Sequence, residues 1–308
     1  MNEKTKGAEG LSFSSDTKAE LCREPLQKRC CAIAEAYGIL LYCNMFTANE
    51  IRIVTSSAEL AERLPKLFKK AFGHGFDASP AADIKGKRIF SITDRKAIAD
   101  IFEVYGYEAR GILAHHINLG ILEDNCCRAA FLRGAFLAGG SITNPEKSYH
   151  LELVTAHFNV SRETFSILLE LGFSPKDAAR AGNYITYFKQ SEAIEDFFTL
   201  TGASVAAMEI MSAKVEKDMR NDVNRRVNCD SANADKIVSA AQEQLDTIRK
   251  IEREQGLDAL PDKLRETALL RIANPEASLS DLAMLASPAV SKSCINHRLR
   301  KLLEFGGV

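Results

Sequence analysis

Several features that would identify a common class of protein are missing from this 308-residue chain. A formal net charge of −1 at pH 7 provides no general attraction to nucleic acid or to an anionic membrane, so any basic surface must be local. No apolar run approaches the roughly 18 residues of a membrane helix, and the first ten residues are polar, without the apolar core of a signal peptide. We therefore expect a cytoplasmic protein that does not bind membranes.

Metal-binding patterns are also missing, although there are eight cysteines. No two cysteines are spaced as CxxC, and no histidines have ligand spacing, so neither zinc nor another metal or cofactor is expected. Two adjacent pairs, Cys30-Cys31 and Cys126-Cys127, fall in stretches predicted to be buried helices. In a reducing cytosol these pairs are predicted to be small buried hydrophobic residues and not disulfides.

What the chain does contain is a repeat, formed by residues 30–45 and 126–141. Both stretches are apolar, end-capped and of helical length, and are too short to span a bilayer. Small residues recur in register on one face of the two predicted helices: Ala34, Gly38, Ala130, Gly134 and Ala138. Because glycine inside a helix is unfavourable by about 1 kcal/mol relative to alanine, we interpret this face as a close helix–helix contact. Two ordinary core helices that contain glycine are the alternative.

The elements that follow each motif helix also repeat. The pattern Ile-x-Asp-x-Phe-x-x-x-Gly ends at Gly106 and again at Gly202, an offset of 96 residues that also relates the motif helices. We expect helices at 57–72, 95–105, 161–171 and 192–200, and strands at 46–55, 88–92, 149–155 and 183–189. The prediction is a duplicated αββαββα unit of the α+β class, a pseudo-two-fold saddle with halves at about 11–120 and 121–213. Residues 1–10 are predicted to be a disordered leader.

The composition changes at residues 214–231, where basic and acidic side chains alternate. Arg220, Arg225 and Arg226 could contact phosphate as secondary DNA contacts, but the interspersed aspartates favour a solvated linker. A helical domain is then predicted over 232–308, beginning with a long helix from Asn233 to Gly256.

Three short helices are expected at the end of this domain, at 261–273, 279–286 and 289–305. The tight turn at Ser287-Pro288 and the preceding third helix predict a helix-turn-helix over 261–305. In the last helix the apolar positions should face inward, while polar and basic side chains that suit DNA bases and phosphates cover the rest. The predicted DNA-binding residues are Ser291, Lys292, Ser293, Asn296, His297, Arg298, Arg300 and Lys301. A solvated amphipathic helix in a protein-binding bundle is the alternative.

These motifs carry a resemblance to a known family. The two motif helices resemble those of LAGLIDADG homing endonucleases, and the segment Val290–Leu302, VSKSCINHRLRKL, together with the duplicated domain is similar to the WhiA family. That resemblance covers nearly the whole chain. It implies a transcription regulator of sporulation, cell division or chromosome segregation in Gram-positive bacteria, which binds double-stranded promoter DNA at the nucleoid.

The resemblance also raises the question of nuclease activity. Homing endonucleases hold divalent metal with an acid at the C-terminal end of each motif helix, and the matching positions here are Cys43 and Gly139. Since neither is an acid, we expect no catalytic residue, no metal at this position and no enzyme activity. The alternative function is an interaction scaffold or ligand sensor that binds a protein or a small molecule on the saddle.

Overall fold

The computed structural model describes residues 12–80, 86–107 and 115–307, and the chain divides into two compact units, Met1–Lys217 and Asp218–Val308. The predicted disordered leader at residues 1–10 lies outside the described residues.

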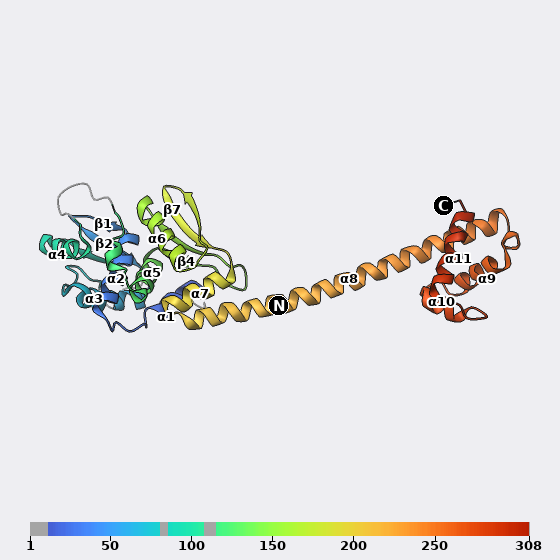
Figure 1. Ribbon diagram of the computed structural model, residues 1–308, viewed down its shortest axis with the longest axis horizontal. Coiled ribbons are helices and arrows are strands. Elements are labelled where there is room, and N and C mark those ends of the chain that lie inside the picture. Colours follow the sequence, from blue (N-terminus) through green and yellow to red (C-terminus); the bar gives the residue numbers. More distant parts are fainter. Residues whose placement is uncertain (1–11, 81–85, 108–114, 308) are drawn as a thin grey trace, which may run out of the picture. The chain divides into compact units, whose positions relative to one another are not determined.

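The two motif helices form the centre of the first unit. They are α2 (Arg29–Tyr42) and α5 (Asn125–Gly139), and they pack directly against each other (Figure 1). A Cβ atom added to Gly134 would lie 2.0 Å from the carbonyl oxygen of Glu35, and one added to Gly38 would lie 2.1 Å from that of Phe131. Their backbones therefore touch at these two glycines, and the close contact predicted from the small-residue face is confirmed.

The first half of this unit surrounds α2 with three other helices and a small sheet. The helices are α1 (Phe13–Leu21), α3 (Ala58–Phe72) and α4 (Arg95–Tyr105). The strands β1 (Met45–Phe46), β2 (Ile51–Thr55) and β3 (Arg88–Ile92) form an antiparallel sheet in the order β1-β2-β3. Capping residues determine both ends of α3. The Ser57 side chain accepts a hydrogen bond from Leu60 N at its start, and Gly73 ends the helix with φ 79°.

The second half repeats this arrangement around α5. It contains the 3-10 turn η1 (Leu119–Ile121) and the helices α6 (Phe158–Glu170) and α7 (Ser191–Thr201). Its strands β4 (Gly140–Ile142), β5 (Leu151–Thr155), β6 (Lys176–Arg180) and β7 (Asn183–Phe188) form an antiparallel sheet in the order β4-β5-β7-β6. The sequence did not predict β4 or β6. All five side chains of β6 are exposed, so this edge strand has no alternating pattern.

The predicted linker proves to be helical. A single helix, α8 (Ser204–Glu254), runs through residues 214–231 and through the predicted helix start at Asn233. The expected solvation is present, because residues 215, 216 and 218–240 are exposed and Lys217 is half-buried. The expected interruption of the helix is absent. No glycine or proline occurs between Ser204 and Glu254 to stop a helix. None of the helices in the described ranges is long and apolar enough to cross a membrane.

Three helices pack on the end of α8 in the second unit, as the sequence predicted. They are α9 (Asp262–Ala273), α10 (Leu279–Leu285) and α11 (Lys292–Phe305), preceded by the turn η2 (Leu257–Ala259). Helix α11 begins three residues later than expected. The core they share is aliphatic and includes Ile248, Ile251, Leu282, Ile295, Leu299 and Leu302.

Candidate nucleic-acid interface

Helix α11 is held by one face and has a well-defined start. Ser291 is the N-cap, and its side chain accepts a hydrogen bond of 3.2 Å from Cys294 N. Ile295, Leu299 and Leu302 are at most 1% exposed. Because these three side chains recur at helical spacing, the opposite face of α11 points to solvent.

The exposed face contains seven of the eight residues predicted to bind DNA. Their side chains lie at the N-terminal end and along the outer side of the helix: Ser291, Lys292, Ser293, Asn296, His297, Arg300 and Lys301. No acidic residue occurs between Ser291 and Lys301. This part of the surface therefore combines positive charge with hydrogen-bonding side chains.

Arg298 differs from the other predicted residues. Its side chain is only 14% exposed, with Nη1 3.5 Å from Glu266 Oε2 and 3.5 Å from Thr267 Oγ1, both on α9. These contacts orient α11 against α9. Arg298 is thus a positioning residue, and its guanidinium is not directed to solvent as the sequence suggested.

Two further features stabilise this arrangement. Arg271, 2% exposed, donates from Nε to Gln244 Oε1 (3.0 Å) on α8 and from Nη1 to Ala277 O (2.7 Å) before α10; burial lowers the pKa of its guanidinium. Ser278 and Asp281 form a reciprocal capping box at the start of α10. Sequence patterns did not predict the Arg271 contacts, since its partners lie on other elements.

The secondary set of arginines lies on α8. Arg220, Arg225 and Arg226 are exposed there, and Arg225 Nη1 is 3.9 Å from Asp222 Oδ1. Each is therefore accessible, but its charge is partly balanced by acids on the same helix.

The ends of the motif helices do not provide a carboxylate pair. Cys43 follows α2, and its thiol lies 3.1 Å from Leu40 O and 3.3 Å from Met45 O, while burial raises its pKa to about 12. A Cβ atom on Gly139 would lie 2.5 Å from Val154 O. A larger residue would not fit at position 139 without displacing β5, and the Cys43 thiol is neutral.

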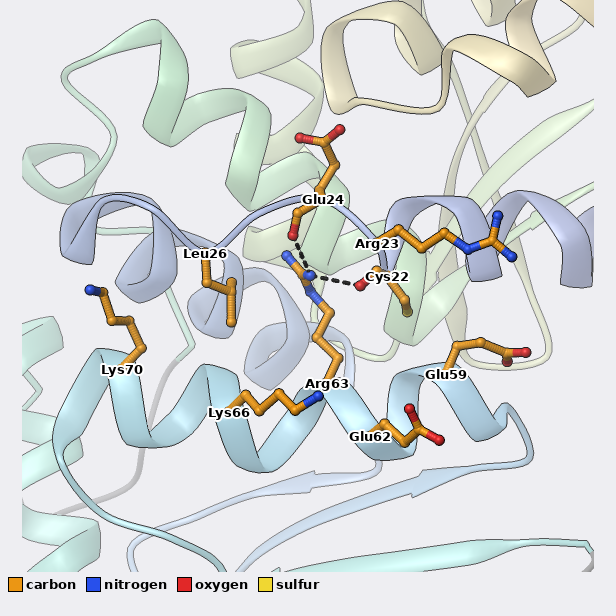
Figure 2. A pocket seen from close by; sticks show the side chains of 9 residues that line it. All are labelled: Cys22, Arg23, Glu24, Leu26, Glu59, Glu62, Arg63, Lys66 and Lys70. Carbon is orange, nitrogen blue, oxygen red and sulfur yellow. Dashed lines mark hydrogen bonds between the residues drawn. The ribbon is translucent and has the colours of Figure 1, made fainter.

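The buried carboxylate of α2 is paired with arginines. Glu35 is 1% exposed, and it accepts hydrogen bonds from Arg63 Nε (2.6 Å) and Nη2 (2.8 Å), with Arg133 Nη1 3.4 Å away. Figure 2 shows Arg63 reaching from α3 to the backbone of Cys22 and Glu24, at the wall of a groove of about 580 Å³. Burial alone would lower the pKa of Arg63, but Glu35 outweighs it and the pKa is raised. Glu35 therefore has a structural role.

Basic side chains on the two sheets of the saddle are also balanced by acids. Arg52 Nε lies 3.0 Å from Glu50 Oε1, and Arg180 Nη2 lies 3.7 Å from Glu152 Oε1. The positive charge of these two strand arginines is therefore partly balanced by carboxylates beside them.

One cluster is contrary to the sequence-based expectation. The Sγ atoms of Cys30, Cys31, Cys126 and Cys127 all lie within 4.8 Å of one another. The pairs are distant in sequence, so ligand spacing gave no indication of them. The repeat did contain a signal, because both pairs hold the same position in the two motif helices.

Two family models match parts of this chain. Residues 128–220 match the family described as "WhiA LAGLIDADG-like domain", and residues 223–305 match "WhiA C-terminal HTH domain". A protein of Ruminiclostridium cellulolyticum, named probable cell division protein WhiA, is 38% identical over 96% of each chain. A protein of the same name from Staphylococcus haemolyticus is also 38% identical over 96% of each chain.

The chain belongs to the WhiA family. The crystal structure of full-length DUF199/WhiA from Thermatoga maritima is 25% identical, with 96% of this chain and 98% of that one covered and a TM-score of 0.59. The family resemblance read from residues 290–302 and from the motif helices is confirmed. So is the fold class, a LAGLIDADG-like α+β domain followed by a helix-turn-helix region. The exposed face of α11 lies within residues 223–305, which match the WhiA C-terminal HTH domain.

Proposed function

We propose that this protein is a sequence-specific regulator of transcription that binds double-stranded promoter DNA at the nucleoid, with α11 as its recognition helix. The observation that carries the proposal is the start of α11, where capped backbone, hydroxyl groups and positive charge lie together on an exposed face. The name of the relatives, probable cell division protein WhiA, supports a role in cell division. A role in sporulation or chromosome segregation in Gram-positive bacteria is a further part of the proposal.

Each part of the face has a distinct task in this proposal. Asn296 and Arg300 are four residues apart, so they lie one above the other on the helix, where Asn suits adenine and Arg suits guanine in the major groove. Ser291, Ser293 and the first N–H groups of α11 bind phosphate, which is favoured at a helix N-terminus. The positive side chains Lys292 and Lys301 and the imidazole of His297 lie beside them, and Arg220, Arg225 and Arg226 add weaker contacts.

The test begins with selection of a binding sequence from fragments of the source genome, using the full chain. Gel-shift titrations on that sequence should then show that Asn296→Ala and Arg300→Ala each weaken binding about 5- to 150-fold, from about 1–3 kcal/mol per lost base contact. The matched control is Arg249→Ala, which removes an exposed arginine paired with Asp246 on α8. Equal affinities for all three variants and the wild type would reject α11 as the recognition helix.

Salt dependence separates DNA binding from the alternative, a scaffold or ligand sensor that binds a protein or small molecule on the saddle. Binding driven by phosphate contacts falls steeply as salt rises, because counterions are released. An apolar partner bound on the saddle would show little such dependence. A flat salt response, with no selected sequence, would favour the scaffold function.

We also propose that the protein does not cleave DNA. Support comes from the neutral, hydrogen-bonded thiol of Cys43 and the tightly packed backbone at Gly139, where homing endonucleases carry acids. Supercoiled plasmid incubated with the full chain and Mg²⁺ or Mn²⁺ should remain intact. Metal-dependent nicking that is lost in a variant of a nearby acid, such as Glu152→Gln, would contradict this proposal.

A further inference from the structure

Four cysteine thiols converge at the N-terminal ends of the two motif helices. Cys30 and Cys31 occupy the first turn of α2, Cys126 and Cys127 occupy the first turn of α5, and all four Sγ atoms lie within 4.8 Å of one another. The two pairs are 96 residues apart, the offset that relates Gly38 to Gly134. They are therefore equivalent positions of the duplicated unit, brought together by the glycine contact between the helices.

The separation of the sulfur atoms fits one kind of metal centre. Four thiolates at about 2.3 Å from a tetrahedral zinc ion are about 3.8 Å apart, and all of the sulfur separations here are within 4.8 Å. Cysteine ligands of a four-iron cluster must be farther apart, since they surround a larger core. We propose that Cys30, Cys31, Cys126 and Cys127 bind a single zinc ion as a tetrahedral tetrathiolate site.

Burial, and then the neighbouring thiols, raise the pKa of the metal-free Cys31 thiol to about 11 and raise that of Cys127 above its usual range, so zinc must displace protons from these thiols as it binds. The ends of the two helices offset part of this cost. Two helix N-termini face the cluster, and the positive end of a helix stabilises a thiolate. The N-cap residues, Lys28 and Asp124, make no side-chain capping bond, and neither first turn contains an acid.

Packing alone does not account for the cluster. Only Cys127 is buried, Cys31 and Cys126 are half-buried, and Cys30 is exposed, whereas a cysteine that serves as a small core residue should be inside. The exposed edge at Cys30 gives an ion a path from solvent. Binding releases the four thiol protons as zinc–sulfur bonds form, and no electron is transferred.

The position indicates what the ion would do. Cys30 precedes Cys43 by 13 residues, so the site lies about 20 Å along α2 from the end where homing endonucleases hold their metal, at 1.5 Å per residue. It has no access to a scissile phosphate at that end. A zinc ion here would cross-link the two halves of the duplicated domain beside the glycine contact, and so stabilise their packing.

The experiment uses the full chain, purified with a non-thiol reductant and without chelators, and measures bound metals by plasma mass spectrometry. We expect about one zinc ion per chain after gel filtration, and Co²⁺ bound in its place should give sulfur-to-cobalt charge-transfer absorption and tetrahedral ligand-field bands. Removing the ion with a chelator should lower the melting temperature of the first unit. The double variant Cys30→Ser/Cys126→Ser should lose at least nine-tenths of the metal.

The matched control is Cys229→Ser, which replaces an exposed cysteine outside the cluster and should keep the full metal content. Because the double variant could unfold, thiol alkylation of the wild-type chain gives a second measurement. Zinc should protect the four cluster cysteines, but not Cys229, and a chelator should remove the protection. A wild-type chain that binds neither zinc nor Co²⁺ under reducing conditions would overturn the proposal, as would two native disulfides within the cluster.

Discussion

Replacing Gly134 with alanine tests the backbone contact on which the first unit depends. The new methyl group would lie 2.0 Å from Glu35 O and 3.0 Å from Ile39 N, where ordinary contacts begin at 3.4 Å. Both neighbours are backbone atoms inside α2, so no side-chain rotation can relieve the overlap. The helices must instead separate by about 1 Å, which already removes a quarter to a half of the dispersion energy of the contacts across the interface.

Two opposing effects set the magnitude of this change. Alanine has a higher helix propensity than glycine by about 1 kcal/mol, which alone would stabilise α5. Overpacking typically destabilises by about 1–3 kcal/mol, and a backbone contact that cannot be relieved belongs at the upper end. We therefore expect the free energy of unfolding to fall by about 2 kcal/mol. Gly38→Ala should behave similarly, and the double variant should lose less than the sum, because both changes separate the same helices.

The assay can be confined to the first unit because of the distribution of chromophores. The chain has no tryptophan, and its seven tyrosines run from Tyr37 to Tyr187, so the tyrosine signal in near-ultraviolet circular dichroism during urea titration reports on Met1–Lys217. Gly75→Ala is the matched control, since an added Cβ there meets nothing within 4 Å. It should leave stability unchanged or slightly raised. Equal stability of Gly134→Ala and wild type would refute the backbone contact.

Three further changes test other parts of the molecule. Arg63→Ala should lower the tyrosine-monitored free energy of unfolding by about 3–5 kcal/mol, because it leaves the buried Glu35 carboxylate without its bidentate partner; the same loss in Glu35→Gln/Arg63→Met would contradict this reason. His157 should make the first unit acid-sensitive, because burial, and then the nearby His115, lower the pKa of its imidazole to about 4. Below about pH 6.5 the unfolded chain binds a proton at His157 that the folded chain does not. The free energy of unfolding therefore falls as the pH falls towards 4. The fall in melting temperature from pH 7.5 to pH 5 should be smaller in His157→Gln. Ser278→Ala should destabilise α10 by about 1 kcal/mol by removing its capping box, seen as faster amide exchange in α10 than in wild type; unchanged exchange would show that packing, not the cap, holds the helix.

Elements with their own end signals were predicted well from the sequence. Helix α4 has the predicted bounds, because Asp94 caps its start and Gly106, with φ 72°, ends it. The motif helices were found from apolar composition and small-residue spacing. Such signals are local, so they can be read without knowing which elements become neighbours.

Elements without a buried face were missed. Strand β6 is exposed along its whole length and is held by backbone pairing with β7 across the turn at Ala181-Gly182. The charged part of α8 was interpreted as a linker for the same reason: its side chains are solvated, so no apolar periodicity marks the helix. In both cases hydrophobic patterning, which detects burial, could not detect structure.

The candidate DNA-binding face was predictable to the extent that it depends on one helix. Helical spacing separates Ile295 and Leu299 from Asn296 and Arg300 without further information. Arg298 lies at the border between these faces, and the contact that decides its orientation, Glu266, comes from α9. The hydrophobic periodicity of α11 does not show which residue of another helix will contact Arg298.

The cysteine cluster shows how duplication limits the usual search for metal ligands. Ligand spacing is informative when one loop or one helix supplies a pair, but here each ligand has its counterpart 96 residues later. Gly38 and Gly134 place the two helices in contact. A residue near this contact therefore lies close to its counterpart in the other helix, and two pairs of adjacent cysteines form one group of four converging thiols. The same reasoning applies to Cys43 and Gly139 at the other ends, where the counterparts meet without a carboxylate. One helix pair thus lacks metal ligands where homing endonucleases have them and gathers four soft ligands at its opposite end.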